Sequence, residues 1–325
     1  MAAHPEVPQH LVELLGTSLR LQQSLEAGAG GRGLQQGGLR RGQRSPACSV
    51  PGVLQGAALD RLRQGCEELI AQVRHHDPKG LGNRGAKRYS FGSCSSTGHQ
   101  VHRPEWAALL DLPTVARVLE AIWGPGYACT GGGGDFCLPE CIEHQTLHQD
   151  CSFRPSVLGC EVAPFIAVNF AVDDLTPFNG PLRQIPRTQH TPYTEAPCPH
   201  EESEAMLLST VCPAAAGAAI FRDLRCWHGG TPNLSTGWRA LPNVEFAAPT
   251  LVSARLPKVM PYDVWQGLSQ QGQHLARHIV AEKGNWVEPS MEFWPDLGQH
   301  CFLRPAQVTP LFECCRGIFE YEEID

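Results

Sequence analysis

The stretch GAAIFRDLRCWHGGTPNLSTGWRALPNVEF, residues 217–246, decides the fold that this chain is expected to adopt. It contains two apolar runs, 217–221 and 238–246, and each has the length of a β-strand. The segment between them is rich in Gly, Pro, Asn and Ser, which favour turns over helix. The stretch therefore predicts two consecutive strands joined by an irregular connection.

Similar short apolar runs occur upstream, at 165–172, 182–186 and 207–211. Strands of this length and spacing are typical of an antiparallel sandwich or barrel. The 33 Gly and 27 Pro of the chain also favour many short elements over long helices. We therefore expect a mainly β fold, in which the four glycines at 131–134 form a flexible hairpin or lid.

Flanking helices are expected before and after these strands. After a short strand at 53–56, apolar residues from Leu59 to Val73 follow one helical face. A second helical segment, 105–123, is interrupted by Pro113 and stopped by Gly124. Residues 83–102 between them are polar and irregular.

The two ends of the chain differ in their residue pattern from the strand-rich central region. Residues 7–26 have helical apolar spacing, 27–43 form a flexible Gly/Arg-rich linker, and a last helix is expected over 264–282. The predicted organisation is an N-terminal helix and linker over 1–47, then one domain over 48–325. A C-terminal helical extension of that domain begins at about 262.

Charge and composition exclude several classes of function. The net charge of −7 argues against a nucleic-acid partner, and no stretch reaches the roughly 20 apolar residues of a membrane span. The N-terminus has no secretory pattern, so the 14 cysteines are expected to be free thiols in a reducing, cytoplasmic compartment; organelle import stays open. Cys137 and Cys141 have metal-like spacing, but no second pair completes a zinc site.

A His-Gln-Asp triplet at 148–150 lies where a further strand is expected. Residues i and i+2 of a strand share a face, so His148 and Asp150 can converge on one ion. His228, at the end of an apolar run, offers a second imidazole. Two imidazoles and a carboxylate on one face of an iron leave three adjacent positions for other ligands. Either histidine alone could equally be an ordinary hydrogen-bonded residue.

Arg239 falls inside the predicted strand 238–246, where an unpaired guanidinium is costly to bury. A buried arginine favours a carboxylate that accepts two parallel hydrogen bonds. A dicarboxylate co-substrate would provide one, with its other end on the iron. The alternative is an ion pair with a protein acid such as Glu245.

These motifs together resemble the phytanoyl-CoA dioxygenase family of Fe(II)/2-oxoglutarate oxygenases. The resemblance covers roughly residues 50–250, and its motifs, in the family's order, are HQD at 148–150, DDLTPFNGPL at 173–182, IPRTQ at 185–189 and the run 217–239. It implies a double-stranded β-helix core of the jelly-roll or cupin-like kind, with helices packed on one side.

The resemblance also implies roles for individual residues. His148, Asp150 and His228 would bind Fe(II), and Arg239 would bind a carboxylate of 2-oxoglutarate. Asn169 and Ser235 would contact the same co-substrate, although Asn169 could instead bond a neighbouring main chain. O₂ would be the second co-substrate, with ascorbate as a reductant.

The expected activity is hydroxylation of a small organic or lipid-like substrate, with release of succinate and CO₂. The same iron centre could instead serve desaturation, epimerisation or cyclisation. Other classes left open are a non-catalytic jelly-roll binding protein and a zinc hydrolase. The sequence identifies neither the substrate nor the oligomeric state.

Overall fold

The computed structural model describes residues 48–91, 99–145, 147–151, 162–185, 188–190, 210–252 and 256–288. The predicted N-terminal helix and linker lie outside these residues, as does everything beyond 288. Among the described residues, none of the helices combines the length and the apolar character that a bilayer crossing requires.

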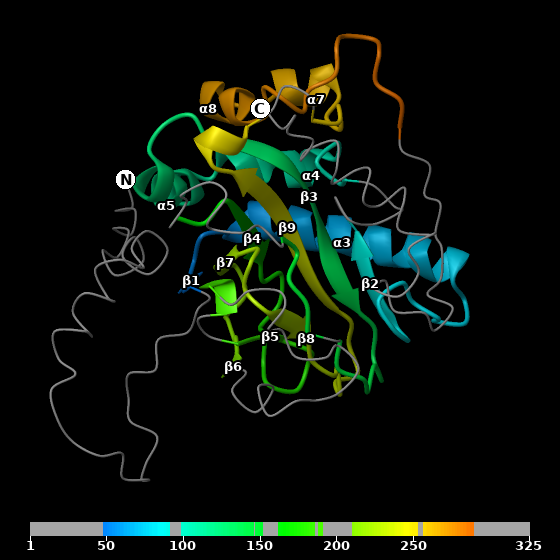
Figure 1. Cartoon of the computed structure of the whole chain (residues 1–325). Coiled ribbons are helices and arrows are strands. Elements are labelled where there is room, and N and C mark those ends of the chain that lie inside the picture. The colour runs from blue at the N-terminus through cyan, green and yellow to red at the C-terminus, as the bar shows by residue number, and fades with distance from the viewer. Residues whose placement is uncertain are drawn as a thin grey trace, which may run out of the picture.

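Two antiparallel sheets form the centre of the fold (Figure 1). The larger has the strand order β1-β7-β4-β9-β3-β2 and the smaller the order β6-β5-β8. Their strands are β1 (Cys48–Val50), β2 (Arg88–Phe91), β3 (Ala128–Cys137), β4 (Phe165–Phe170), β5 (Leu182–Gln184), β6 (Thr210–Val211), β7 (Ala219–Asp223), β8 (His228–Gly230) and β9 (Arg239–Ala247). The mainly antiparallel β character predicted from the sequence is confirmed.

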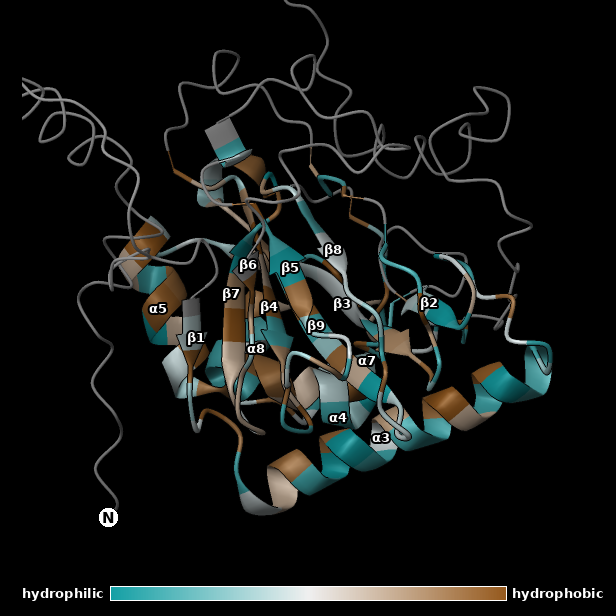
Figure 2. Cartoon of the chain, turned by 90° about the horizontal axis from the view of Figure 1, so that it is seen from below, coloured by the Kyte–Doolittle hydropathy of each residue, from teal (hydrophilic) through white to brown (hydrophobic). Residues whose placement is uncertain are grey.

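Helices pack on the face of the large sheet that points away from the small sheet (Figure 2). They are α3 (Gly56–His76), α4 (Pro104–Ala107), α5 (Pro113–Trp123), α7 (Tyr262–Gln266) and α8 (Gln270–Leu275), together with the 3-10 turn Ala108–Asp111. Two further 3-10 turns, Thr188–His190 and Pro249–Leu251, lie elsewhere in the fold. The amphipathic pattern of α3 places Leu62, Leu69 and Val73 in the core. Gly124 ends α5 with a positive φ of 69°, as its sequence predicts.

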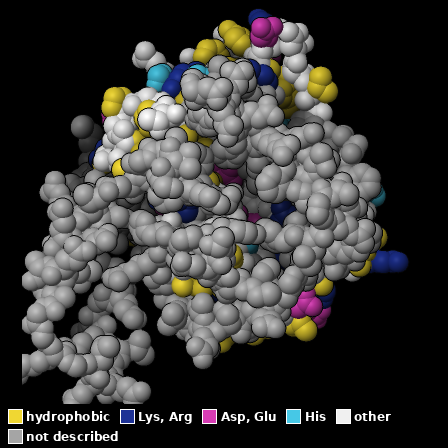
Figure 3. Space-filling model, viewed as in Figure 1, with side chains coloured by type: hydrophobic (Ala, Val, Ile, Leu, Met, Phe, Trp, Pro, Cys, Tyr) yellow, Lys and Arg dark blue, Asp and Glu magenta, His cyan; other side chains and the backbone are white. Residues whose placement is uncertain are grey.

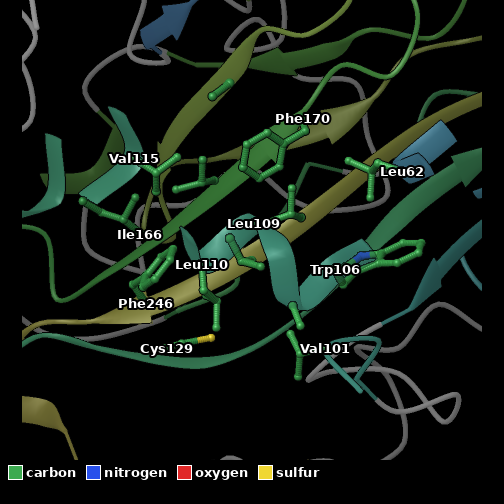
Figure 4. Packing of buried hydrophobic residues seen from close by; sticks show 14 of the residues in the cluster. Leu62, Val101, Trp106, Leu109, Leu110, Val115, Cys129, Ile166, Phe170 and Phe246 are labelled. Carbon is green, nitrogen blue, oxygen red and sulfur yellow. The ribbon is translucent and has the colours of Figure 1, made fainter. Parts of the chain in front are cut away.

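Side-chain alternation gives the large sheet two different faces. Its helix-facing side is apolar: Phe170, Phe221 and Phe246 pack with Trp106 and Leu110 in the main core (Figure 4). The opposite face, which points between the sheets, carries buried polar side chains. They are Arg88, Asn169, Arg222, Arg239 and Asn243. An interior lined in this way is suited to binding a polar ligand.

The four glycines at 131–134 lie inside β3, so the predicted hairpin or lid is wrong. β3 pairs with β9 on one side and β2 on the other. A Cβ at Gly132 would lie 2.5 Å from the Asn243 carbonyl oxygen, and the Trp106 indole donates to the Gly133 carbonyl at 2.7 Å. Glycine is therefore needed here because the neighbouring backbones approach closely, not because the chain must bend.

Three other local predictions need correction. The strand predicted at 53–56 lies earlier, at β1, and Gln55 is the N-cap of α3. The polar stretch 83–102 contains β2, because Tyr89 and Phe91 reach the helix-side core. The single helix predicted at 264–282 is two short ones, separated where Ser269 caps α8 and binds Asp111.

Candidate metal centre

The His-Gln-Asp triplet is positioned by backbone pairing rather than by a strand. His148 and His228 exchange two backbone hydrogen bonds of 2.9 Å in an isolated bridge, which corrects the strand predicted for 148–150. The amide of Asp150 donates to the Leu224 carbonyl at 3.0 Å. The Gln149 side chain instead donates to the Arg225 carbonyl at 2.6 Å. The triplet is thereby fixed along the β7–β8 connection.

This pairing brings the three predicted ligands together. The Nε2 atoms of His148 and His228 lie 3.4 Å and 3.3 Å from the two Asp150 carboxylate oxygens. Donors at right angles, each about 2.1 Å from one ion, would be about 3 Å apart. The two imidazoles and the carboxylate are therefore close enough for one ion to bind all three side chains. Among the described residues, these three form the group of His, Cys, Asp and Glu side chains placed to share a metal.

The protonation states favoured at the site also suit a cation. Burial opposes ionisation of Asp150, but His228 and then Arg222 outweigh it and hold the pKa of the carboxyl well below its usual range. Burial, followed by Arg222, holds the pKa of His228 well below its ordinary value. Nδ1 of His228 lies 2.9 Å from the Cys226 carbonyl. A proton there leaves the Nε2 lone pair for the ion.

Arg239 lies at the start of β9, on the inner face, and is 2% exposed. Its Nη1 donates to the Asp135 carbonyl at 3.1 Å, while its Nε is buried without a partner. The ion pairs of the described residues include none between Arg239 and Glu245. Burial, with Arg88 nearby, lowers the pKa of the guanidinium. This buried cation has a donor left over for a ligand.

A family model described as Phytanoyl-CoA dioxygenase (PhyH) matches residues 44–241. The chain belongs to the phytanoyl-CoA dioxygenase family. Membership implies an oxidoreductase that depends on iron and 2-oxoglutarate, and the triad is, among the described residues, a group of side chains that could hold a metal ion. The match ends two residues after Arg239, so it spans the predicted iron ligands and the predicted co-substrate contacts.

Several solved structures are similar in fold. The crystal structure of EvdMO1 is 22% identical with a TM-score of 0.45, covering 62% of this chain but only 47% of EvdMO1. The non-heme alpha ketoglutarate dependent epimerase SnoN from nogalamycin biosynthesis gives 14% identity and a TM-score of 0.42, covering 62% and 76%. AviO1 from Streptomyces viridochromogenes Tue57 gives 22% and 0.43, covering 62% and 90%. No curated protein matched the chain.

The other two predicted co-substrate contacts differ in their surroundings. Asn169 lies on the inner face of β4 opposite Asn243, and its Oδ1 is buried without a partner. The Ser235 hydroxyl donates within its own turn, to Asn233 Oδ1 at 2.7 Å. The structure thus leaves the Asn169 amide oxygen free to accept a hydrogen bond from a ligand in the interior. A contact with 2-oxoglutarate, which has only acceptor oxygens, would need the Nδ2 group and stays a prediction. A contact from Ser235 stays a prediction.

Sequence reasoning missed several polar residues around the site. Arg222 follows the apolar run 217–221 directly, so the apolar pattern does not mark it, although it shares the parity of Ile220 in β7. Arg88 lies in the stretch 83–102, whose polar composition predicts irregular structure. Cys137 accepts a hydrogen bond from Cys141, which lowers the pKa of its thiol to about 6, and Arg239 and Arg88 act in the same direction against burial.

Charged side chains of both signs and a histidine are visible at the centre of the face in Figure 3.

Proposed function

We propose that this protein is an Fe(II)/2-oxoglutarate-dependent oxygenase that hydroxylates a small organic or lipid-like substrate. His148, Asp150 and His228 would hold the ion. The observation that carries the proposal is the convergence of these three side chains, together with a buried, incompletely paired Arg239 on the inner face of the large sheet. We further propose that the two facing sheets form a double-stranded β-helix.

Each residue has a distinct task in this proposal. The two imidazoles and the carboxylate bind one face of the ion and leave three adjacent positions for other ligands. The Arg239 guanidinium would donate to the distal carboxylate of 2-oxoglutarate in a charge-assisted pair, and Asn169 would orient the same molecule. When bound, iron and 2-oxoglutarate supply the activation of O₂ and the oxidation of a C–H bond, with succinate and CO₂ released.

An apolar cluster lies beside Asp150 and would exclude water from the reacting substrate. It consists of Cys151, Phe165, Ala167, Leu224, Ala247 and Leu251. Leu224 is the residue whose carbonyl accepts from the Asp150 amide. This surface supports a substrate with an apolar part next to the oxidised carbon.

The test separates metal binding from co-substrate binding by calorimetry without O₂. The native protein should bind Mn²⁺, and His228→Ala should lose most of that affinity. Arg239→Ala should keep Mn²⁺ but bind 2-oxoglutarate roughly 10- to 150-fold more weakly, since it loses charge-assisted hydrogen bonds. Arg225→Lys is the matched control, because Arg225 is an equally buried arginine that pairs with Asp223 instead.

Failure of the native protein to bind Mn²⁺ would overturn the metal centre. Unchanged 2-oxoglutarate affinity in Arg239→Ala would reassign that residue to structure. A screen for substrate-stimulated succinate release, with the product mass determined, then distinguishes hydroxylation from desaturation or epimerisation. Hydroxylation adds one oxygen atom to the substrate, whereas the other two reactions add none.

A further inference from the structure

Arg222 is a buried cation at the metal centre that the proposed function leaves without a task. It lies on β7, and its side chain is 5% exposed. Its Nη1 donates to Oδ2 of Asp150 at 2.7 Å and lies 3.2 Å from Nδ1 of His228. A single nitrogen of Arg222 thus contacts two of the three proposed ligands.

Burying this guanidinium is costly, and little else compensates it. Its Nε is buried without a partner, and Asp150 is the one acid with which its described contacts form an ion pair. Arg225, three residues on, differs: it makes three side-chain hydrogen bonds to Asp223, of 2.7–3.2 Å. Asp223 and Arg225 thus neutralise each other's charge through these hydrogen bonds. Arg222 instead depends on the Asp150 carboxylate, which the ion would also bind.

The geometry bears on how Asp150 can bind a metal. A carboxylate can offer an ion one oxygen or both. Chelation by both requires each oxygen to turn toward the ion, but a short charge-assisted hydrogen bond engages Oδ2 and restrains rotation of the group. Chelation would also occupy a fourth position of an octahedral ion, leaving two in place of three.

We propose that Arg222 is a positioning residue of the metal centre: by holding Oδ2, it makes Asp150 bind the ion through one oxygen and keeps three adjacent positions open. The inference rests on the proposed function, since it assumes that the triad binds a metal. Two of those positions suffice for a chelating co-substrate. Arg222 would therefore keep the third position open for an additional reactant such as O₂.

The test compares the denticity of Asp150 in Mn²⁺-loaded crystals of the native protein and of Arg222→Met. The native structure should show one Asp150 oxygen on the ion, and the variant should show both. In solution, the number of exchangeable waters, measured by water proton relaxation, should fall by about one third. Affinity for 2-oxoglutarate should stay near native, in contrast with Arg239→Ala, because two positions remain.

Two further variants separate positioning from folding. Arg222→Lys retains a charged donor for Oδ2 and should restore binding through one oxygen. Arg222→Leu also removes the donor to Oδ2, so Asp150 should chelate the ion as in the Met variant, and this variant provides the test if Arg222→Met does not fold. If Asp150 bound the ion through one oxygen in the native protein and in both uncharged variants, the proposed role of Arg222 would be overturned. The proposed function would be unaffected by that result. Absence of Mn²⁺ from the native triad would overturn the proposed function instead.

Discussion

At the scale of single residues, the glycine that ends β8 is explained by an arginine from another strand. Arg88 crosses β8 and donates to the carbonyls of Thr231 and Glu143 at 2.8 and 3.0 Å. A Cβ on Gly230 would lie 2.0 Å from Nη1 of Arg88. The second glycine of the His-Gly-Gly sequence therefore provides space for Arg88 rather than a special turn, since its φ is not positive.

Replacing Gly230 by Ala should displace the Arg88 guanidinium and lower the free energy of unfolding by roughly 1–3 kcal/mol, the usual cost of overpacking. Denaturant titration followed by circular dichroism measures this. Gly237→Ala is the control, since a Cβ there meets no atom within 4 Å. Equal stability of the two variants would show that Arg88 moves aside freely.

At the scale of elements, β3 shows how a glycine-rich segment can be a central strand. Its pairing with β9 runs from Ala128 opposite Ala247 to Cys137 opposite Arg239, so it fixes the strand that carries Arg239. A register shift lies between Cys129 and Gly131, where the His99 ring packs over the backbone and accepts from the Gly132 amide at 3.1 Å. The glycines of β3 therefore allow this strand to pack closely against both β9 and the His99 ring.

Gly132→Ala distinguishes a packed strand from a lid. The new Cβ would lie 2.5 Å from the Asn243 carbonyl oxygen, so β3 and β9 must separate, at a cost of roughly 1–3 kcal/mol. Thermal unfolding should report the loss. Because Asn243 follows Arg239 on the same face of β9, affinity for 2-oxoglutarate should also fall. A variant as stable as native protein would show that β3 and β9 can separate at no measurable cost.

At the scale of the whole molecule, the large sheet separates an apolar helical layer from a polar interior. Such a layered fold buries titratable groups where the layers meet. His99 is 7% exposed, and burial lowers its pKa to about 4. The native protein therefore keeps this imidazole neutral at a pH where the unfolded chain would protonate it.

The folded pKa of His99, about 4, lies below its unfolded value of about 6.5, so the unfolded state binds more protons between these limits. Stability should therefore fall as pH drops from about 6.5 to 4, by up to roughly 3 kcal/mol from this residue. Unfolding measured across this range tests it. His99→Gln should have a flatter profile, while His76→Gln, an exposed histidine at the end of α3, should keep the native slope. Parallel profiles for all three would refute the assignment.

Local pattern alone determined a large part of this protein. Helical periodicity placed α3, and Gly124 marked the end of α5, because these signals depend on neighbouring residues. Apolar runs located β4, β7 and β9 for the same reason. Motif order and spacing carried the resemblance to the family, which the match over 44–241 confirms.

Only the tertiary structure decided what depends on residues far apart in the chain. The pairing of Arg222 with Asp150 joins positions 72 residues apart, and Arg88 reaches Thr231 across 143. The glycines of β3 looked flexible because the sequence does not show which backbones will approach them. His148 and Asp150 converge through a bridge to His228, not through the strand geometry expected of them. Contacts between residues far apart in the chain produce no periodic pattern in the sequence. The residues that surround the site could therefore be identified only from the paired strands and sheets of the structure.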